Sequence, residues 1–413
     1  MRVTYLSPSA ELGGAERCLL DLMAAVRDAS PDDELSLVTA GDGPLVARAA
    51  ALGVTSIALP MPPALRGFGD SALGLGRRRW LPVVAGTRAA VAGAGYAVRL
   101  RRAIATLRPH VIHSNGMKFH LLGALACGGA TPVLWHLRDF VGSRRLMASA
   151  LRLAAPRARS AIAISGAVAA DARRCMPTLP VEVCYDAIDV AEFSPASVGG
   201  SALDALAGLP PAPAGTIRVG LVATYARWKG QDLFLRAVSR ALAALPGARF
   251  YVAGGPIYAT HGSQFSRDEL ARLAGALGLR ERVGFLPFQA DPAWLFRALD
   301  VVVHASTRPE PFGRTIAEGM ACGRAVIATR DAGAAELVHA GLDAELYPAG
   351  DEEALSRAMI RLAGDAGIRG RMGEAARATA LSRFSRRRLG NELVALYARA
   401  AACTAALGPE GGT

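Results

Sequence analysis

Short runs of apolar and β-branched residues alternate along this chain with longer segments of helical periodicity. This alternation predicts parallel strands joined by crossover helices, so the expected fold class is α/β with helices on both faces of each sheet. In the first half the pattern predicts strands over residues 2–7, 34–39, 55–59, 110–114, 132–137, 160–164 and 181–184. In the second half it predicts strands over 217–223, 249–253, 301–304 and 325–328. The helices expected between them include 15–27, 88–107 and 231–244.

A stretch rich in Pro, Gly, Ser and Ala interrupts the alternation at residues 193–215 and predicts a linker. The expected parts are therefore an N-terminal domain over 1–192, a C-terminal domain over 216–384, and a last helix with a tail over 385–413 that packs back on the N-terminal domain. Both domains are expected to be doubly wound and Rossmann-like, facing each other across a cleft. Ligands of such sheets bind beyond the carboxyl ends of the strands.

The composition is that of an enzyme-sized globular protein, with 413 residues of which 52% are hydrophobic and 20% charged. The six cysteines include no CxxC pair, which argues against a metal or disulfide framework. The first residues run directly into a strand pattern, and no apolar run reaches the roughly 18 residues that a membrane-spanning helix needs. We therefore expect a cytoplasmic protein.

Positive charge is concentrated in the first half of a chain whose net charge is +12. Residues 71–170 carry fifteen basic side chains and one acid, and the segment 65–109 interleaves arginines with aromatic and apolar residues. This pattern favours an anionic partner, either a phosphorylated acceptor or an acidic membrane surface contacted by 65–109 at the cytoplasmic face. A merely solvated arginine-rich surface is the alternative. Nucleic acid is not expected, because no recognition motif accompanies the charge.

Two carboxylates, Glu310 and Glu318, lie eight residues apart on either side of a Phe-Gly pair, where a strand leads through a polar loop into a helix. A carboxylate accepts two strong hydrogen bonds, and vicinal hydroxyls of a sugar or ribose offer two donors. Two glutamates at this spacing, taken without their flanking sequence, could equally be two surface charges. The sequence that flanks the two glutamates decides between these interpretations.

A second candidate site combines two cations with the start of a helix. Arg227 and Lys229 precede Gly230 there, and Lys229 is one of only two lysines in the chain. Side-chain charge and helix N–H groups at such a position favour an anion. A similar anion site is indicated by Gly13 and Gly14 before the first helix, although the GxGxxG fingerprint of a dehydrogenase is missing.

The segment 310–327 closely resembles the E-x7-E signature, with its following Gly-Met-Ala-x-Gly-x-x-Val-Ile run, of the retaining GT-B glycosyltransferases of family 4. The resemblance implies that Glu310 contacts the donor sugar, Glu318 the ribose, and Arg227 and Lys229 the diphosphate. The residues expected to act in catalysis are His136, Arg227, Lys229 and Glu310. Those expected to bind the donor are Gly13, Gly14, Arg227, Lys229, Phe285, Phe288, Glu310, Pro311, Phe312, Gly313, Arg314, Thr315 and Glu318. Those expected on the acceptor side are Glu16, Asn115, Lys118 and Arg138.

One departure from the family pattern is the turn 185–190, where Asp186 and Ala187 stand in place of a common Asn-Gly pair. It puts the geometry between the domains in question.

The expected reaction is transfer of a sugar with retention, from a UDP-sugar or alternatively a GDP-sugar as co-substrate, without a cofactor. No Asp-x-Asp pair is present to hold a metal-bound diphosphate, so no metal is expected. The acceptor is expected to be a lipid-linked or cell-envelope glycan, with a soluble secondary metabolite as the alternative. More remote alternatives are a UDP-sugar epimerase and a non-catalytic nucleotide-sugar-binding protein.

Overall fold

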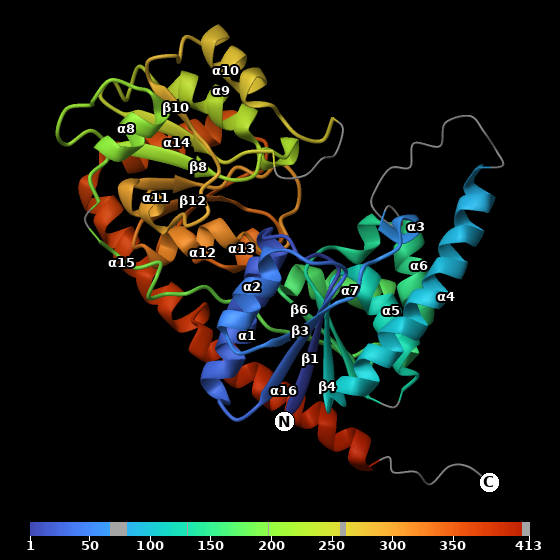
Figure 1. The fold of residues 1–413 in the computed structure, drawn as a ribbon. Helices are drawn as coiled ribbons and strands as arrows, with labels where there is room; N and C mark the ends of the chain where they lie inside the picture. The colour runs from blue at the N-terminus through green and yellow to red at the C-terminus, as the bar shows by residue number, and fades with distance from the viewer. Residues whose placement is uncertain (67–80, 130, 197, 257–261, 407–413) are drawn as a thin grey trace, which may run out of the picture. The chain divides into compact units, whose positions relative to one another are not determined.

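The computed structural model describes residues 1–66, 81–129, 131–196, 198–256 and 262–406, and it contains two compact units. Unit 1 comprises residues 1–187 together with the C-terminal segment that begins at Arg386. Unit 2 comprises Ile188–Ser385. Each unit is a parallel α/β sheet with helices on both faces, as the alternating pattern predicts (Figure 1).

Unit 1 is built on a seven-stranded sheet in the order β3-β2-β1-β4-β5-β6-β7. Its strands are β1 (Arg2–Ser7), β2 (Glu34–Thr39), β3 (Thr55–Ala58), β4 (Val111–Asn115), β5 (Val133–Leu137), β6 (Ser160–Ala163) and β7 (Val181–Val183). Its helices are α1 (Gly14–Ala29), α2 (Pro44–Ala51), α3 (Pro63–Arg66), α4 (Leu81–Leu107), α5 (Met117–Cys127), α6 (Arg145–Ala154), α7 (Gly166–Cys175) and α16 (Arg386–Ala406), with short 3-10 turns η1 (Val141–Ser143) and η2 (Ala155–Arg157).

The last helix, α16, packs beside the first, α1, so the two ends of the chain share one layer of unit 1 (Figure 1). Leu19, Leu22 and Val26 of α1 recur at helical spacing and are buried with Leu393 of α16 in one core. The approach is close enough to require glycine at position 390, because a Cβ there would lie 2.1 Å from the carbonyl oxygen of Ala25.

Unit 2 is built on a six-stranded sheet in the order β10-β9-β8-β11-β12-β13. Its strands are β8 (Arg218–Val222), β9 (Arg249–Ala253), β10 (Val283–Leu286), β11 (Val301–Val303), β12 (Ala325–Thr329) and β13 (Glu345–Tyr347). Its helices are α8 (Ser201–Ala207), α9 (Gln231–Ala241), α10 (Arg267–Ala276), α11 (Ala293–Ala298), α12 (Arg314–Ala321), α13 (Ala332–Glu336), α14 (Glu352–Gly364) and α15 (Ala366–Arg383), with the 3-10 turn η3 (Arg227–Lys229).

The segment 193–215, expected to be a linker, contains helix α8 and is held to unit 2 by buried polar contacts. Asp204 accepts hydrogen bonds from the Tyr251 hydroxyl at 2.5 Å and from the Arg218 guanidinium at 2.9 Å. The Pro and Gly content of the segment does not reveal this anchoring, because it depends on one carboxylate meeting two partners from the sheet.

Within the described residues no helix is long and apolar enough to cross a membrane. The basic stretch 65–109 lies partly outside the description, since residues 67–80 are not included.

Candidate functional site

The centre of the unit 2 sheet brings together the two loops that carry the candidate donor-binding residues. β8 and β11 are adjacent and parallel, so the loops after their carboxyl ends lie side by side. The amide of Thr307 donates to the carbonyl of Trp228 at 2.7 Å and joins the two loops. Gly230, at φ +74°, sits so close to the second loop that a Cβ would lie 2.0 Å from the carbonyl oxygen of Ala305. A glycine is therefore required for Lys229 to reach this position.

The Glu310 carboxylate is the focus of the site. Its Oε2 atom lies 2.5 Å from Lys229 Nζ, 2.8 Å from the Ser306 hydroxyl and 3.2 Å from His304 Nε2. Within the described residues, no hydrogen bond is made to the other oxygen, Oε1. Thr329, at the end of β12, lies 3.3 Å from His304 Nδ1 and orients the imidazole.

Glu310 is almost fully buried, and burial alone opposes its charge. Lys229 and His304 more than offset that cost and hold the pKa of the carboxyl well below its ordinary value. Glu310 is therefore an anion at neutral pH and acts as a hydrogen-bond acceptor, not as an acid.

Glu318 is buried on α12, eight residues further along, and accepts a hydrogen bond from Arg314 Nε at 2.7 Å. Gly313 caps this helix in the left-handed region, at φ +96°. Thr315 is half-buried in the first turn. The Phe312 side chain is buried and packs against Phe384 of the same unit, with ring centroids 5.9 Å apart. Its ring therefore forms part of the packing that supports the loop.

Arg227 and Lys229 do not converge on one point. Lys229 pairs with Glu310, whereas Arg227 pairs with Glu269 of α10 at 2.7 Å and stacks on Phe265 at 4.3 Å. The shared anion site for the two cations stays a prediction, and in this structure each of them pairs with a carboxylate of its own. The reason is that η3 turns the two side chains, two residues apart, toward different neighbours.

The two phenylalanines expected to bind the donor differ in exposure. Phe285, on β10, is buried in the core of unit 2, and Phe288, beyond the strand end, is 47% exposed. Pro311, in the Glu310 loop, is half-buried. Of these three, Phe288 presents the largest apolar surface to solvent.

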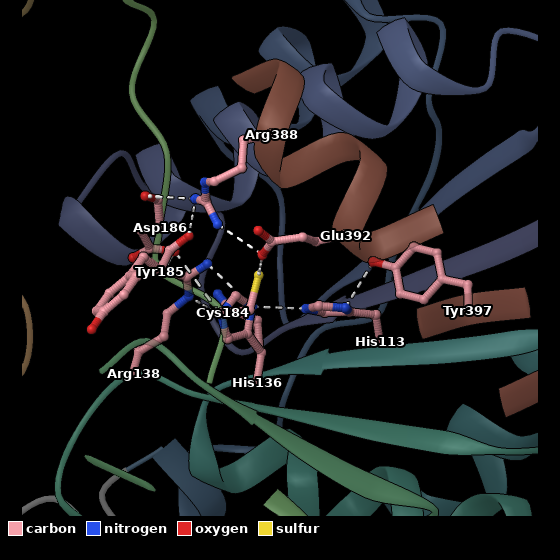
Figure 2. Close-up of polar contacts among 10 residues, drawn as sticks. His113, His136, Arg138, Cys184, Tyr185, Asp186, Arg388, Glu392 and Tyr397 are labelled. Carbon is pink, nitrogen blue, oxygen red and sulfur yellow. Dashed lines mark hydrogen bonds and ion pairs between the residues drawn. The ribbon is translucent and has the colours of Figure 1, made fainter. Parts of the chain in front are cut away.

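Unit 1 gathers a second group at the carboxyl ends of its central strands (Figure 2). Asn115 ends β4, and His136 is its register partner on β5. Arg138 follows β5, donates to Asn115 Oδ1 at 2.6 Å, and forms two bonds with the Asp186 carboxylate at 2.6 and 2.8 Å. The replacement of Asn by Asp at position 186 is thus matched by a buried ion pair in which Arg138 Nη1 reaches both carboxylate oxygens.

The glycine loop of unit 1 lies at the start of α1. Gly13 is the N-cap residue, and a Cβ at Gly14 would meet nothing within 4 Å, so packing alone does not demand glycine there. Burial raises the pKa of Glu16 above its ordinary value, and the positive charge of Arg138 offsets part of that rise. Lys118, on α5, is half-buried. Because Arg138 acts electrostatically on Glu16, Glu16 belongs to the group around Arg138.

Several residues of these groups were not predicted as site residues. The sequence predicts only a strand end at His304, and it assigns no site role to Ser306, Thr329, His113, Tyr397 and Asp186. His304 follows a buried strand at the sheet edge where Glu310 lies, which is a signal that could have identified it. Among the described residues, no group of three His, Cys, Asp or Glu side chains is arranged to hold a metal ion.

Comparison with known proteins agrees with this architecture. The family model described as Glycosyltransferase Family 4 matches residues 12–192, and the one described as Glycosyl transferases group 1 matches residues 211–379. Among solved structures, HepE from Anabaena in complex with UDP-glucose has a TM-score of 0.77 at 24% identity, covering 97% of this chain and 100% of that chain. The sucrose-phosphate synthase from Thermosynechococcus elongatus has a TM-score of 0.76 at 18% identity, covering 97% and 99%. At these identities the likeness shows the fold.

Curated relatives with the name D-inositol 3-phosphate glycosyltransferase include one from Mycobacterium tuberculosis and one from Mycobacterium ulcerans. The one from Mycobacterium tuberculosis is 35% identical over 225 residues, and the one from Mycobacterium ulcerans is 37% identical over 175 residues. These alignments span 53% and 42% of this chain, and only 44% and 36% of the relatives' own length. The two family models together match most of the chain, one in each half, and the whole-chain fold agrees with them. The chain belongs to glycosyltransferase family 4 and has the GT-B fold of that family.

Proposed function

We propose that the chain is a retaining glycosyltransferase that uses a UDP-sugar as donor and needs no metal ion. The observation that carries the proposal is the Glu310 carboxylate, fixed as an anion by Lys229, His304 and Ser306 at the carboxyl edge of the unit 2 sheet. A buried carboxylate held through one oxygen leaves the other to accept from hydroxyl groups of a sugar. Glu318, on the following helix, is assigned to the ribose.

Lys229 supplies the positive charge that a departing diphosphate requires. Its ammonium group carries three N–H donors, of which Glu310 accepts one in the structure. Fixed donors placed where negative charge develops stabilise a transition state without a metal. The bond from the anomeric carbon to the phosphate oxygen breaks, the acceptor oxygen bonds to the same face, and the leaving phosphate oxygen takes the acceptor's proton.

UDP is the favoured nucleotide, because HepE, which shares the whole-chain fold, was solved with UDP and with UDP-glucose. A thermal-shift series with UDP, GDP and ADP, each with and without excess EDTA, tests this choice. We expect UDP to raise the melting temperature most, with the same shift in EDTA. A larger shift with GDP would exclude the donor proposed here, and loss of the UDP shift in EDTA would exclude the metal-free reaction.

An anionic acceptor is proposed from the charge of the N-terminal half and from the name of the curated relatives, which specifies an inositol phosphate. A lipid-linked acceptor at an acidic membrane is the preferred form. On α4, Arg101 and Arg102 are exposed beside Val98, which is 51% exposed. Basic side chains next to apolar surface favour an anionic interface.

Co-sedimentation with liposomes tests the membrane contact. Binding to anionic but not to neutral vesicles at low salt is expected, with weaker binding after Arg101→Ala and Arg102→Ala, since each basic residue contributes about 1 kcal/mol near such a surface. Equal behaviour with both vesicle types would favour the second candidate, a soluble anionic acceptor.

A further inference from the structure

A row of three buried polar side chains crosses unit 1 from its last helix to the end of β5 (Figure 2). The Tyr397 hydroxyl, on α16, lies 2.9 Å from His113 Nδ1, and His113 Nε2 lies 3.0 Å from His136 Nδ1. All three side chains are fully buried. Neither His113 nor Tyr397 belongs to the expected site, and the two lie 284 residues apart in the sequence.

The direction of the hydrogen bonds along this row follows from Arg138. Its Nη2 atom lies 3.4 Å from His136 Nδ1, and a guanidinium group can only donate. His136 Nδ1 is therefore the acceptor, and in a neutral imidazole the hydrogen must then be on Nε2. His113 Nε2 consequently donates to His136, so His113 Nδ1 accepts from the hydroxyl of Tyr397.

Both imidazoles are neutral in this environment. Burial, reinforced by the positive charge of Arg138, lowers the pKa of His113 to about 3 and that of His136 well below its ordinary value. A neutral imidazole has a single N–H, so the direction of one bond in the row determines the others.

The hydrogen on His136 Nε2 has no partner within the described residues, although the atom is buried. Asp186 Oδ1 lies 4.0 Å away, beyond hydrogen-bonding distance, and Asp186 is already engaged by Arg138. A buried donor without a partner is costly and requires an explanation. Here the same side chain is the histidine near the end of β5 that is expected to act in catalysis.

We propose that Tyr397 and His113 are positioning residues that keep His136 as a neutral imidazole with its hydrogen on Nε2, so that it donates to a substrate oxygen instead of removing a proton. The substrate part of this inference rests on the function proposed above. Arg138 sets the direction of the row, and Tyr397 of the last helix holds it by donating to His113 Nδ1.

The inference is tested by NMR of protein labelled with 15N-histidine, in which two-bond correlations identify the nitrogen that carries the hydrogen. The His136 signal is assigned by its loss in His136→Gln. In the wild-type protein we expect the hydrogen on His136 Nε2 and on His113 Nε2. A hydrogen on His136 Nδ1 would overturn the proposal, and this measurement needs no substrate.

Tyr397→Phe removes the donor at the end of the row. We expect the His113 and His136 signals to show a second tautomer and kcat to fall about three- to tenfold with little change in donor KM, since one neutral hydrogen bond is lost. The matched control is Tyr96→Phe, which removes a buried hydroxyl bonded to the carbonyl of Leu59 at 2.7 Å in the same unit. The control should leave both histidine signals and kcat unchanged.

Unchanged tautomers and kcat in Tyr397→Phe would reject a positioning role for Tyr397. Failure of UDP to bind, with the tautomers as expected, would instead count against the proposed function alone.

Discussion

The Glu310 carboxylate receives Lys229, His304 and Ser306 on a single oxygen, and this arrangement determines what a substitution should do. Glu310→Gln preserves the shape of the side chain and removes its charge. One charge-assisted hydrogen bond contributes about 1.5–3 kcal/mol, so we expect kcat to fall roughly tenfold to a hundredfold while the affinity for free UDP changes little. Steady-state kinetics and calorimetric titration with UDP measure the two quantities.

Glu318→Gln should differ from Glu310→Gln by weakening the binding of free UDP as well, because Glu318 is assigned to the ribose. The matched control is Glu353→Gln, which neutralises an exposed carboxylate paired with Arg357 on α14 and should change neither quantity. Equal UDP affinity in the Glu310 and Glu318 variants would contradict the assignment of the two carboxylates.

At the scale of elements, the Glu310 loop is held against the start of α13. The amide of Gly333 donates to the carbonyl of Glu310 at 2.9 Å, and a Cβ at Gly333 would lie 2.0 Å from the carbonyl oxygen of Pro311. Gly333→Ala must therefore displace the loop, and we expect a loss of kcat comparable with that of Glu310→Gln.

The control for that variant is Gly370→Ala on α15, where a Cβ meets nothing within 4 Å. Alanine inside a helix stabilises it by about 0.5–1 kcal/mol relative to glycine, so this variant should melt at the same or a higher temperature with unchanged kcat. Full activity of Gly333→Ala would show that the loop tolerates the displacement.

Helix α8 depends on the buried carboxylate of Asp204, which accepts from both Tyr251 and Arg218. Asp204→Ala leaves the guanidinium of Arg218 without its buried counterion, and breaking such a pair costs about 3–5 kcal/mol. We expect a clear drop in melting temperature, whereas Glu353→Ala, which breaks an exposed pair, should shift it little. Equal melting temperatures would mean that α8 contributes nothing to the stability of unit 2.

At the scale of the whole molecule, buried histidines make stability depend on pH. Burial lowers the pKa of both His113 and His120 to about 3, below the ordinary 6.5 that applies when the chain is unfolded. Below pH 6.5 the unfolded chain binds more protons than the folded one, so stability falls as pH decreases toward 3. Each of these histidines should cost about 1.4 kcal/mol per pH unit in that window.

Melting temperatures at pH 7.5 and pH 5.5 measure this dependence. His120→Gln should reduce the difference between the two, because one buried titrating group is removed. The exposed His110 serves as the control, and His110→Gln should leave the difference as in the wild-type protein. An unchanged difference in His120→Gln would contradict the effect assigned to burial.

All the strands except β10 and β13, which are missing from the strands predicted above, follow from the sequence alone, and so do the positions of the site residues along them. Apolar runs and helical periodicity are local properties, and the boundaries they predict for β1, β2 and β9 agree with the structure. Because parallel topology brings the carboxyl ends of strands to one edge, a sequence with Lys229 after one strand and Glu310 after another already indicates a shared site.

Only the tertiary structure decides which side chain each of these residues contacts. Lys229 meets Glu310 across 81 residues of sequence, Arg227 meets Glu269 across 42, and His113 meets Tyr397 across 284. The sequence predicts a joint role for Arg227 and Lys229, and it does not reveal that each pairs with a different carboxylate. A hydrogen bond requires two atoms within about 3 Å and the correct angle, and such geometry is set by how the packed loops and helices meet, which no local pattern encodes.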